Sequence, residues 1–112
     1  MYLSPDGFRC HVVPDRERVI VRPVGELDLA TVGHVEAPLA ELEEAGFAEL
    51  VLDLRETTFL DSTGVHLLIR HTRTAREHGH CFTIVAQDGP VLRALELTGL
   101  MHQIPVVDAS AV

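Results

Sequence analysis

The fold is decided by residues 50–64, which read LVLDLRETTFLDSTG. The nearly continuous apolar run at 50–54 predicts a central strand that is buried on both faces. A helical apolar pattern begins at Val65, so the segment Asp-Ser-Thr-Gly at 61–64 is expected to join strand to helix. At such a junction the first backbone N–H groups lack partners within the helix, and the positive end of the helix dipole lies beside the Ser62 hydroxyl. We therefore expect Ser62 either to cap the helix or to be a site of phosphorylation.

Strand and helix patterns alternate along the rest of the chain. Strands are predicted at residues 8–13, 19–24, 50–54, 81–86 and 104–107, helices at 29–45 and 65–78 with a third beginning at 88, and a turn at 25–28. The short polar connection between the first two strands favours an antiparallel hairpin. Because helices separate the later strands, this order predicts an α/β fold. We expect a mixed, mostly parallel sheet of four to five strands with helices packed against it.

Four residues predict local features of these elements. Gly79 is expected to close the second helix, and Asp88 is expected to cap the third. Pro38 should cost the first helix one hydrogen bond and kink it. Pro23 cannot donate to a sheet ladder, so its side of the strand should be locally unpaired or bulged.

Composition restricts the class of protein. The 112 residues are expected to form one domain, residues 1–112, with a core at about 8–107. Hydrophobic residues make up 46% of the chain, too many for a disordered protein, yet no apolar run approaches the roughly 20 residues of a membrane span. Without a secretion signal at the amino terminus, a cytoplasmic protein is expected, with no membrane contact. The formal net charge of −8 argues against direct nucleic-acid binding.

The cysteine and histidine pattern gives no catalytic or metal site. Cys10 and Cys81 lie in predicted strands and are expected to be buried free thiols, with a disulfide as the minor alternative. The cluster at 78–81, His-Gly-His-Cys, lacks a complete tetrahedral ligand set, so we expect no metal and no other cofactor. A hydrolase that uses Ser62 and His66 is the one enzyme alternative. Ser62 does not lie in a Gly-x-Ser-x-Gly motif, which argues against it.

Three blocks of sequence, in this order, resemble the STAS domain, the fold of bacterial anti-sigma factor antagonists. The blocks are Gly25-Glu26-Leu27-Asp28 with Thr31 shortly after, residues 52–64 ending in Asp-Ser-Thr-Gly, and residues 95–100, which read LELTGL. The likeness covers roughly residues 8–107, and Asp-Ser-Thr-Gly is its most specific part. It implies a small bacterial regulator of transcription that has no catalytic activity of its own.

The resemblance also implies a partner-switching mechanism. In this family the serine that matches Ser62 is phosphorylated by an anti-sigma factor that is itself a serine kinase of the GHKL type, and a separate serine phosphatase resets it. The unphosphorylated antagonist binds the anti-sigma factor and frees the sigma factor, whereas the phosphorylated form dissociates. By position, Ser62 would be the phosphoacceptor with Asp61 beside it. Asp28 would lie in a neighbouring loop of the same partner-facing surface. Dimerisation is left open by the sequence.

Each residue of this expected surface also has a structural alternative. The candidates for partner binding are Asp28, Asp61, Ser62, Thr63, Gly64 and His66. Asp28 could instead cap the first helix, and Asp61 could be an ordinary loop residue. Thr63 ranks below Ser62 as acceptor because a hydroxyl in the first turn is satisfied locally. Gly64 could admit a partner's backbone or relieve crowding at the loop exit. His66 stands where the family often has a small or apolar residue, and it could respond to the charge of a phosphate.

The charge of the phosphate explains how such a switch would work. Phosphoserine brings about −1.5 to −2 charges, which a helix amino terminus tolerates, so the fold should survive. An interface fitted to a neutral hydroxyl does not tolerate it, and a penalty of about 3 kcal/mol weakens binding more than a hundredfold. The rival hypothesis is a STAS interaction module without a phosphoswitch, either a scaffold or a ligand sensor.

Overall fold

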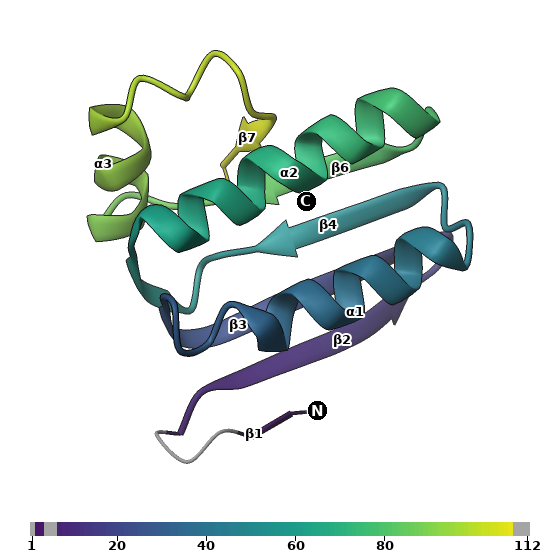
Figure 1. The fold of residues 1–112 in the computed structure, drawn as a ribbon, viewed down its shortest axis with the longest axis horizontal. Helices are drawn as coiled ribbons and strands as arrows, with labels where there is room; N and C mark the ends of the chain where they lie inside the picture. The colour runs from purple at the N-terminus through teal and green to yellow at the C-terminus, as the bar shows by residue number, and fades with distance from the viewer. Residues whose placement is uncertain (1, 4–6, 109–112) are drawn as a thin grey trace.

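The chain folds as a sheet with two helices lying along one of its faces (Figure 1). The structure, a computed structural model, describes residues 2–3 and 7–108. In chain order the elements are β1 (Tyr2–Leu3), β2 (Arg9–Asp15), β3 (Arg18–Leu27), α1 (Gly33–Glu44), β4 (Glu49–Asp53), β5 (Thr57–Leu60), α2 (Ser62–His78), β6 (Cys81–Val85), α3 (Pro90–Leu97) and β7 (Val106–Val107).

The strands form one mixed sheet. Its order is β1-β2-β3-β4-β6-β7, and β5 pairs with β3 outside this row. The pairs β1–β2 and β2–β3 are antiparallel, whereas the pairs of β3 with β4 and β5, of β4 with β6 and of β6 with β7 are parallel. This confirms the predicted α/β fold with a mostly parallel sheet. Within the described residues the sheet has seven strands. The four to five predicted strands omitted β1 and β5.

The region before α2 differs most from the prediction. β3 continues to Leu27 where a turn was predicted at 25–28, and residues 57–60 form β5 where a loop was predicted. The two segments pair in parallel, with Leu27 opposite Leu60, and both leucines are buried. Because the partner of β5 lies more than 30 residues earlier in the chain, this strand carries little local signal. Its pairing fixes the start of α2 to the middle of the sheet.

Pro23 lies at a gap in the pairing of β3. On one side it stands opposite Cys10 in the ladder with β2. On the other side, the pairing of β3 with β4 ends at Val21 and the pairing with β5 begins at Gly25. A residue without a backbone N–H therefore lies where β3 has no strand paired with it on that side, which confirms the expected local loss of pairing.

The helices begin and end close to the predicted residues. α1 starts at Gly33 instead of residue 29, because residues 28–31 form a separate turn, and it continues through Pro38 to Glu44. Gly79 ends α2 in the left-handed conformation, with φ of 73°, as predicted. The predicted cap of α3, Asp88, is wrong: the residue in the N-cap position is Gly89. Since α3 begins with a proline, which has no N–H to satisfy, a side-chain cap is less needed there.

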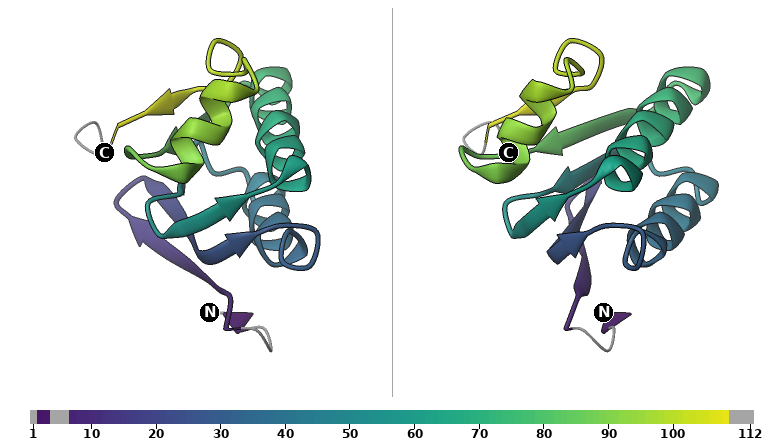
Figure 2. Two further views of the ribbon diagram at one scale, coloured as in Figure 1. Left: turned by 90° about the vertical axis from the view of Figure 1, so that its left-hand side faces the viewer. Right: turned by 60° about the vertical axis from the view of Figure 1, so that its left-hand side comes forward.

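The main core lies between the sheet and the helices α1 and α2. It contains the fully buried side chains of Val21, Leu52 and Ile84 from three adjacent strands, and of Leu39 and Leu68 from the two helices. These contacts fix α2 across the sheet, with its first residue beyond the carboxyl end of β4. Figure 2 shows α1 and α2 on one side of the sheet and α3 beyond its end. None of the helices in residues 2–3 and 7–108 is long and apolar enough to span a membrane.

Candidate functional site

Ser62 is the first residue of α2, and its side chain is exposed. The predicted cap role for this serine is wrong, because the residue in the N-cap position is Asp61. Asp61 has an extended backbone, with φ of −97° and ψ of −174°, and its Oδ1 accepts a hydrogen bond of 3.0 Å from the backbone N of Gly64. Within the described part of the chain, the Ser62 hydroxyl has no hydrogen-bond partner. Asp61 thus stabilises the helix start and leaves the serine available.

Gly64 explains why α2 starts so close to the sheet. A Cβ at this position would collide with Leu60 Cδ1 and would lie 3.0 Å from the backbone O of Leu27. Gly64 is itself buried. Of the two predicted roles, relief of crowding within the chain therefore fits the structure, while contact with a partner's backbone does not.

Asp28 organises the loop that precedes α1. Its Oδ1 accepts a hydrogen bond of 3.0 Å from Ala30 N, and its backbone O accepts from Thr31 N and Val32 N. The N-cap position of α1 is occupied by Val32, which makes no side-chain cap bond, so the expectation that Asp28 caps this helix is wrong. Asp28 instead closes the turn one step before the helix, and its side chain is half-buried.

Thr31 holds this turn on the end of β3, a role that was not predicted beyond its place in the first STAS block. Its hydroxyl donates a hydrogen bond of 2.6 Å to Glu26 O and accepts one of 3.0 Å from Asp28 N. Only 1% of Thr31 is exposed. A buried threonine three residues after an aspartate is the signal by which the turn could have been predicted.

The loop of Asp28 and the start of α2 are adjacent. The backbone N of Asp61 donates a hydrogen bond of 3.3 Å to the O of Leu27, the residue just before Asp28. The expected proximity of these two segments, 33 residues apart, is thus present in the fold. In Figure 2, left, the side of the molecule that carries both segments faces the viewer.

Thr63 and His66 lie in the first two turns of α2. Thr63 is half-buried, whereas His66 is exposed on the same helix as Ser62 and one turn later. The structure therefore gathers Asp28, Asp61, Ser62, Thr63 and His66 around one end of α2, with Gly64 beneath them. We call the first five of these residues, without the buried Gly64, the Ser62 surface.

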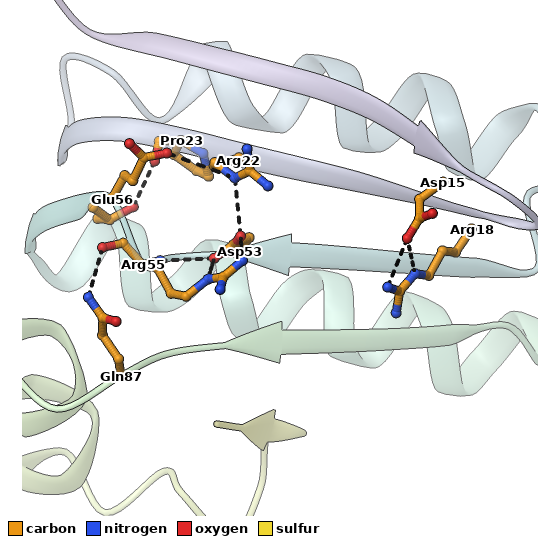
Figure 3. A network of polar contacts seen from close by, with 9 residues as sticks. Asp15, Arg18, Arg22, Pro23, Asp53, Arg55, Glu56 and Gln87 are labelled. Atoms are coloured by element: carbon orange, nitrogen blue, oxygen red, sulfur yellow. Dashed lines mark hydrogen bonds and ion pairs between the residues drawn. The ribbon is translucent and has the colours of Figure 1, made fainter. Parts of the chain in front are cut away.

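A second polar cluster, on the sheet, was missed by sequence analysis (Figure 3). Asp53, at the end of β4, is fully buried, and its carboxylate accepts hydrogen bonds from Arg22 Nε at 3.1 Å and from Arg55 Nε and Nη2 at 2.9 and 2.7 Å. Burial alone would raise the pKa of Asp53, but the hydrogen bonds from Arg55 and Arg22 outweigh it and lower the pKa. An aspartate within a buried strand signals such pairing, since an unpaired buried carboxylate is strongly disfavoured.

A third cluster joins the two helices and was also missed. The buried ring of His71, in α2, contacts two glutamates of α1: its Nε2 contacts Glu36, and its Nδ1 lies 2.7 Å from Glu43 Oε2. Arg70 Nη2 adds an ion pair of 3.1 Å to Glu36. Burial tends to raise the pKa of Glu36, but His71 and Arg70 reverse this and lower it. The cluster fixes α1 and α2 against each other behind the Ser62 surface.

The cysteines do not pair. Cys10 is buried, as predicted, and burial raises the pKa of its thiol to about 11. Cys81 is exposed, so the expectation of a buried thiol is wrong there. It begins β6 on the face opposite the buried Phe82, outside the small apolar cluster of that face, which includes Val85 of the same strand. Among the described residues, no three His, Cys, Asp or Glu side chains are grouped as metal ligands would be.

The sequence and the fold were both compared with those of known proteins. The family described as the STAS domain matches residues 11–111. The anti-sigma F factor antagonist of Paenibacillus polymyxa is 29% identical over 91 residues, which are 80% of this chain and 78% of the relative. The crystal structure of an anti-sigma factor antagonist from Mycobacterium paratuberculosis has a TM-score of 0.79 at 26% identity, covering 94% of this chain and 89% of the other. The Bacillus protein SpoIIAA in its phosphorylated form shares the fold, with a TM-score of 0.68 at 21% identity, over 92% and 91% of the two chains.

Proposed function

The chain belongs to the STAS domain family, and we propose that it is an anti-sigma factor antagonist controlled by phosphorylation of Ser62. In the unphosphorylated state it binds an anti-sigma factor of the GHKL serine kinase type, which then releases its sigma factor. Phosphorylation by that kinase ends the complex, and a serine phosphatase restores it. The protein acts in the cytoplasm by binding and carries out no catalysis of its own.

The observation that carries this proposal is the exposed Ser62 hydroxyl at the start of α2. The capping role that would explain a serine here structurally is filled by Asp61. An acceptor must reach into a kinase active site, and Ser62 lies at an exposed corner of the fold. Its half-buried neighbour Thr63 is less accessible, which supports the ranking of the two hydroxyls.

The surroundings of Ser62 also account for the sign of the switch. The positive end of the α2 dipole lies at this residue, so the folded chain can carry a phosphate there. The carboxylate of Asp61 is adjacent and makes no ion pair within the described residues. A dianion confined between Asp61 and a closely fitted partner loses hydration and is repelled, which is worth about 3 kcal/mol or a hundredfold in affinity. Binding is therefore lost while the fold remains.

One experiment tests both whether Ser62 is the phosphorylated residue and whether charge at this position controls kinase binding. The purified protein is incubated with ATP and a GHKL-type anti-sigma kinase from its own genome, and the modified residue is located by mass spectrometry. We expect phosphate on Ser62 and none in Ser62→Ala, whereas Thr63→Ala should still be labelled on Ser62. In binding measurements, Ser62→Ala should bind the kinase as the unmodified protein does, and Ser62→Asp about a hundredfold more weakly.

Three results would contradict the proposal. If no such kinase labels Ser62, the chain is a constitutive scaffold or a ligand sensor. If Ser62→Ala and Ser62→Asp bind equally well, charge at this position does not control binding. Hydrolysis of generic esters that is lost in His66→Ala would instead establish the hydrolase alternative.

A further inference from the structure

Two large apolar side chains are exposed beside the Ser62 surface. The exposed large hydrophobic residues of the described chain are Val12, Val13, Leu29, Phe47, Phe59 and Leu97. Single apolar residues on a protein surface are common and need no explanation. Leu29 and Phe59 differ from the others in their position. Leu29 lies two residues after Leu27, whose backbone O accepts a hydrogen bond from Asp61 N, and Phe59 lies in β5, the strand that directly precedes α2.

Leu29 is presented on a rigid turn. Its side chain is 77% exposed, although the backbone around it is fixed. The backbone O of Asp28, the residue before Leu29, accepts hydrogen bonds from Thr31 N and Val32 N, at 3.1 and 2.8 Å. The buried Thr31 hydroxyl ties the same turn to Glu26 O. An apolar side chain on an ordered turn has already lost the backbone freedom that binding would otherwise remove, so its burial by a partner contributes more to affinity.

Phe59 is presented by the sheet. It lies in β5 opposite Glu26 of β3, and 48% of it is exposed, while the next residue, Leu60, points into the core. Alternation along the strand places the aromatic ring on the outer side of β5. Both residues thus flank the same strand pair, β3 and β5, from which α2 begins.

Both positions lie within reach of any protein that contacts Ser62. The Cα of Phe59 is three residues from that of Ser62, at most about 11 Å along an extended chain. Leu29 is two residues beyond Leu27, whose carbonyl is bonded to Asp61 N. A standard interface covers about 800 Å² on each partner, a patch of about 16 Å radius. An interface centred on Ser62 therefore covers Phe59 and the turn of Leu29.

We propose that Leu29 and Phe59 are the apolar anchors by which the anti-sigma kinase docks on this chain. The inference rests on the proposed function and adds to it the chemistry of the partner: an apolar socket on the kinase beside its nucleotide site. The two anchors and the hydroxyl then have separate tasks. Leu29 and Phe59 supply affinity in either phosphorylation state, and Ser62 sets whether the complex persists.

The test separates docking from phosphoryl transfer. Leu29→Ala and Phe59→Ala are compared with the unaltered protein in binding to the anti-sigma kinase that labels Ser62, and in the kinetics of that labelling. Truncation of an anchor near the centre of an interface should weaken binding about tenfold in each variant. Because docking contributes equally to ground and transition state, KM for labelling should rise by a similar factor while kcat stays unchanged.

Matched control variants test whether the loss of any exposed apolar side chain would weaken kinase binding equally. Phe47→Ala removes an aromatic side chain of similar exposure, 41%, from the loop between α1 and β4, at the other end of the sheet. It should bind and be labelled like the unaltered protein. Leu29→Met and Phe59→Leu keep an apolar side chain and should restore most of the affinity. Equal circular dichroism and thermal midpoints for all variants establish that the folds are intact.

The outcomes distinguish the two proposals. If the kinase binds and labels the unaltered protein and both alanine variants equally, Leu29 and Phe59 do not dock the kinase, and the proposed function of the chain is unaffected. If Phe47→Ala weakens binding as much as Leu29→Ala and Phe59→Ala, the docking surface is misplaced. If no kinase labels the unaltered protein, both proposals are overturned.

Discussion

Asp53 and Asp61 stand at the same edge of the sheet, but their carboxylates have opposite surroundings. Asp53 ends β4, is fully buried, and accepts hydrogen bonds from two arginines. Asp61 follows β5, is half-buried, and accepts a backbone N–H in the first turn of α2. The first charge is neutralised inside the fold, whereas the second is not. A phosphate added at Ser62 would therefore add to a negative charge that makes no ion pair within the described residues. This difference separates the structural carboxylate of Asp53 from that of Asp61, for which we propose a regulatory role.

The largest effect on stability is expected from Asp53→Asn. This change removes the charge that pairs with Arg22 and Arg55 in a buried position, and we expect the free energy of unfolding to fall by about 3 kcal/mol. Urea denaturation followed by circular dichroism measures it. The matched control is Asp15→Asn, which removes a partly exposed pair with Arg18 and should cost less than about 1 kcal/mol. Equal losses in the two variants would contradict the distinction between buried and exposed pairs.

Acid should remove the contribution of Asp53 to stability. The pKa of Asp53 is lowered from its ordinary value of 3.8, so its stabilisation is fully present above that value and is lost as the pH falls through the folded pKa. The stability difference between the unaltered protein and Asp53→Asn should thus be constant at neutral pH and shrink below about pH 4. Urea denaturation at several pH values measures this. A difference that grows on acidification would show that the sign is wrong.

A smaller loss is expected from Asp61→Ala. The change removes the helix cap, which is worth about 1 kcal/mol. Asp61→Asn keeps the acceptor oxygen without the charge and should recover most of that stability. The same asparagine variant removes the repulsion beside Ser62, so phosphorylation should weaken its kinase binding less than it weakens that of the unaltered protein. If Asp61→Asn is as unstable as Asp61→Ala, the cap is not what Asp61 provides.

The smallest effect is expected from phosphorylation itself. A phosphate on Ser62 gains from the α2 dipole and is repelled by Asp61, so the free energy of unfolding should change by less than about 1 kcal/mol. Thermal midpoints of the phosphorylated and unphosphorylated protein, separated by ion exchange, test this. A large drop in the midpoint would mean that the switch works by unfolding.

The sequence predicted the parts of this site that depend on local patterns. The apolar run at 50–54 and the helical period after Val65 placed the strand, the helix and Ser62 between them. Asp61 and Ser62 are both good capping residues in adjacent positions, so local preference alone did not identify which one is the cap.

Three of the missed features depend on residues far apart in the chain. β5 was missed because its short sequence needs β3 as a partner. Arg22 and Asp53 are 31 residues apart, and no local pattern brings them together. The same is true of His71 and the glutamates of α1, which meet only once two helices have packed on one sheet.

The direct packing of Gly64 on Leu27 and Leu60 also limits where the state of Ser62 can be sensed. The first turn of α2 packs on the sheet, and His71 fixes the later part of the helix to α1. A shift of the first turn would therefore not be transmitted along α2. Modification should leave amide exchange at the distant end of α2 and in the β2–β3 hairpin unaltered. A molecule bound at the distant end of α2 or at the β2–β3 hairpin should therefore have the same affinity for the phosphorylated and unphosphorylated protein. Only a molecule in direct contact with Ser62 could distinguish the two states.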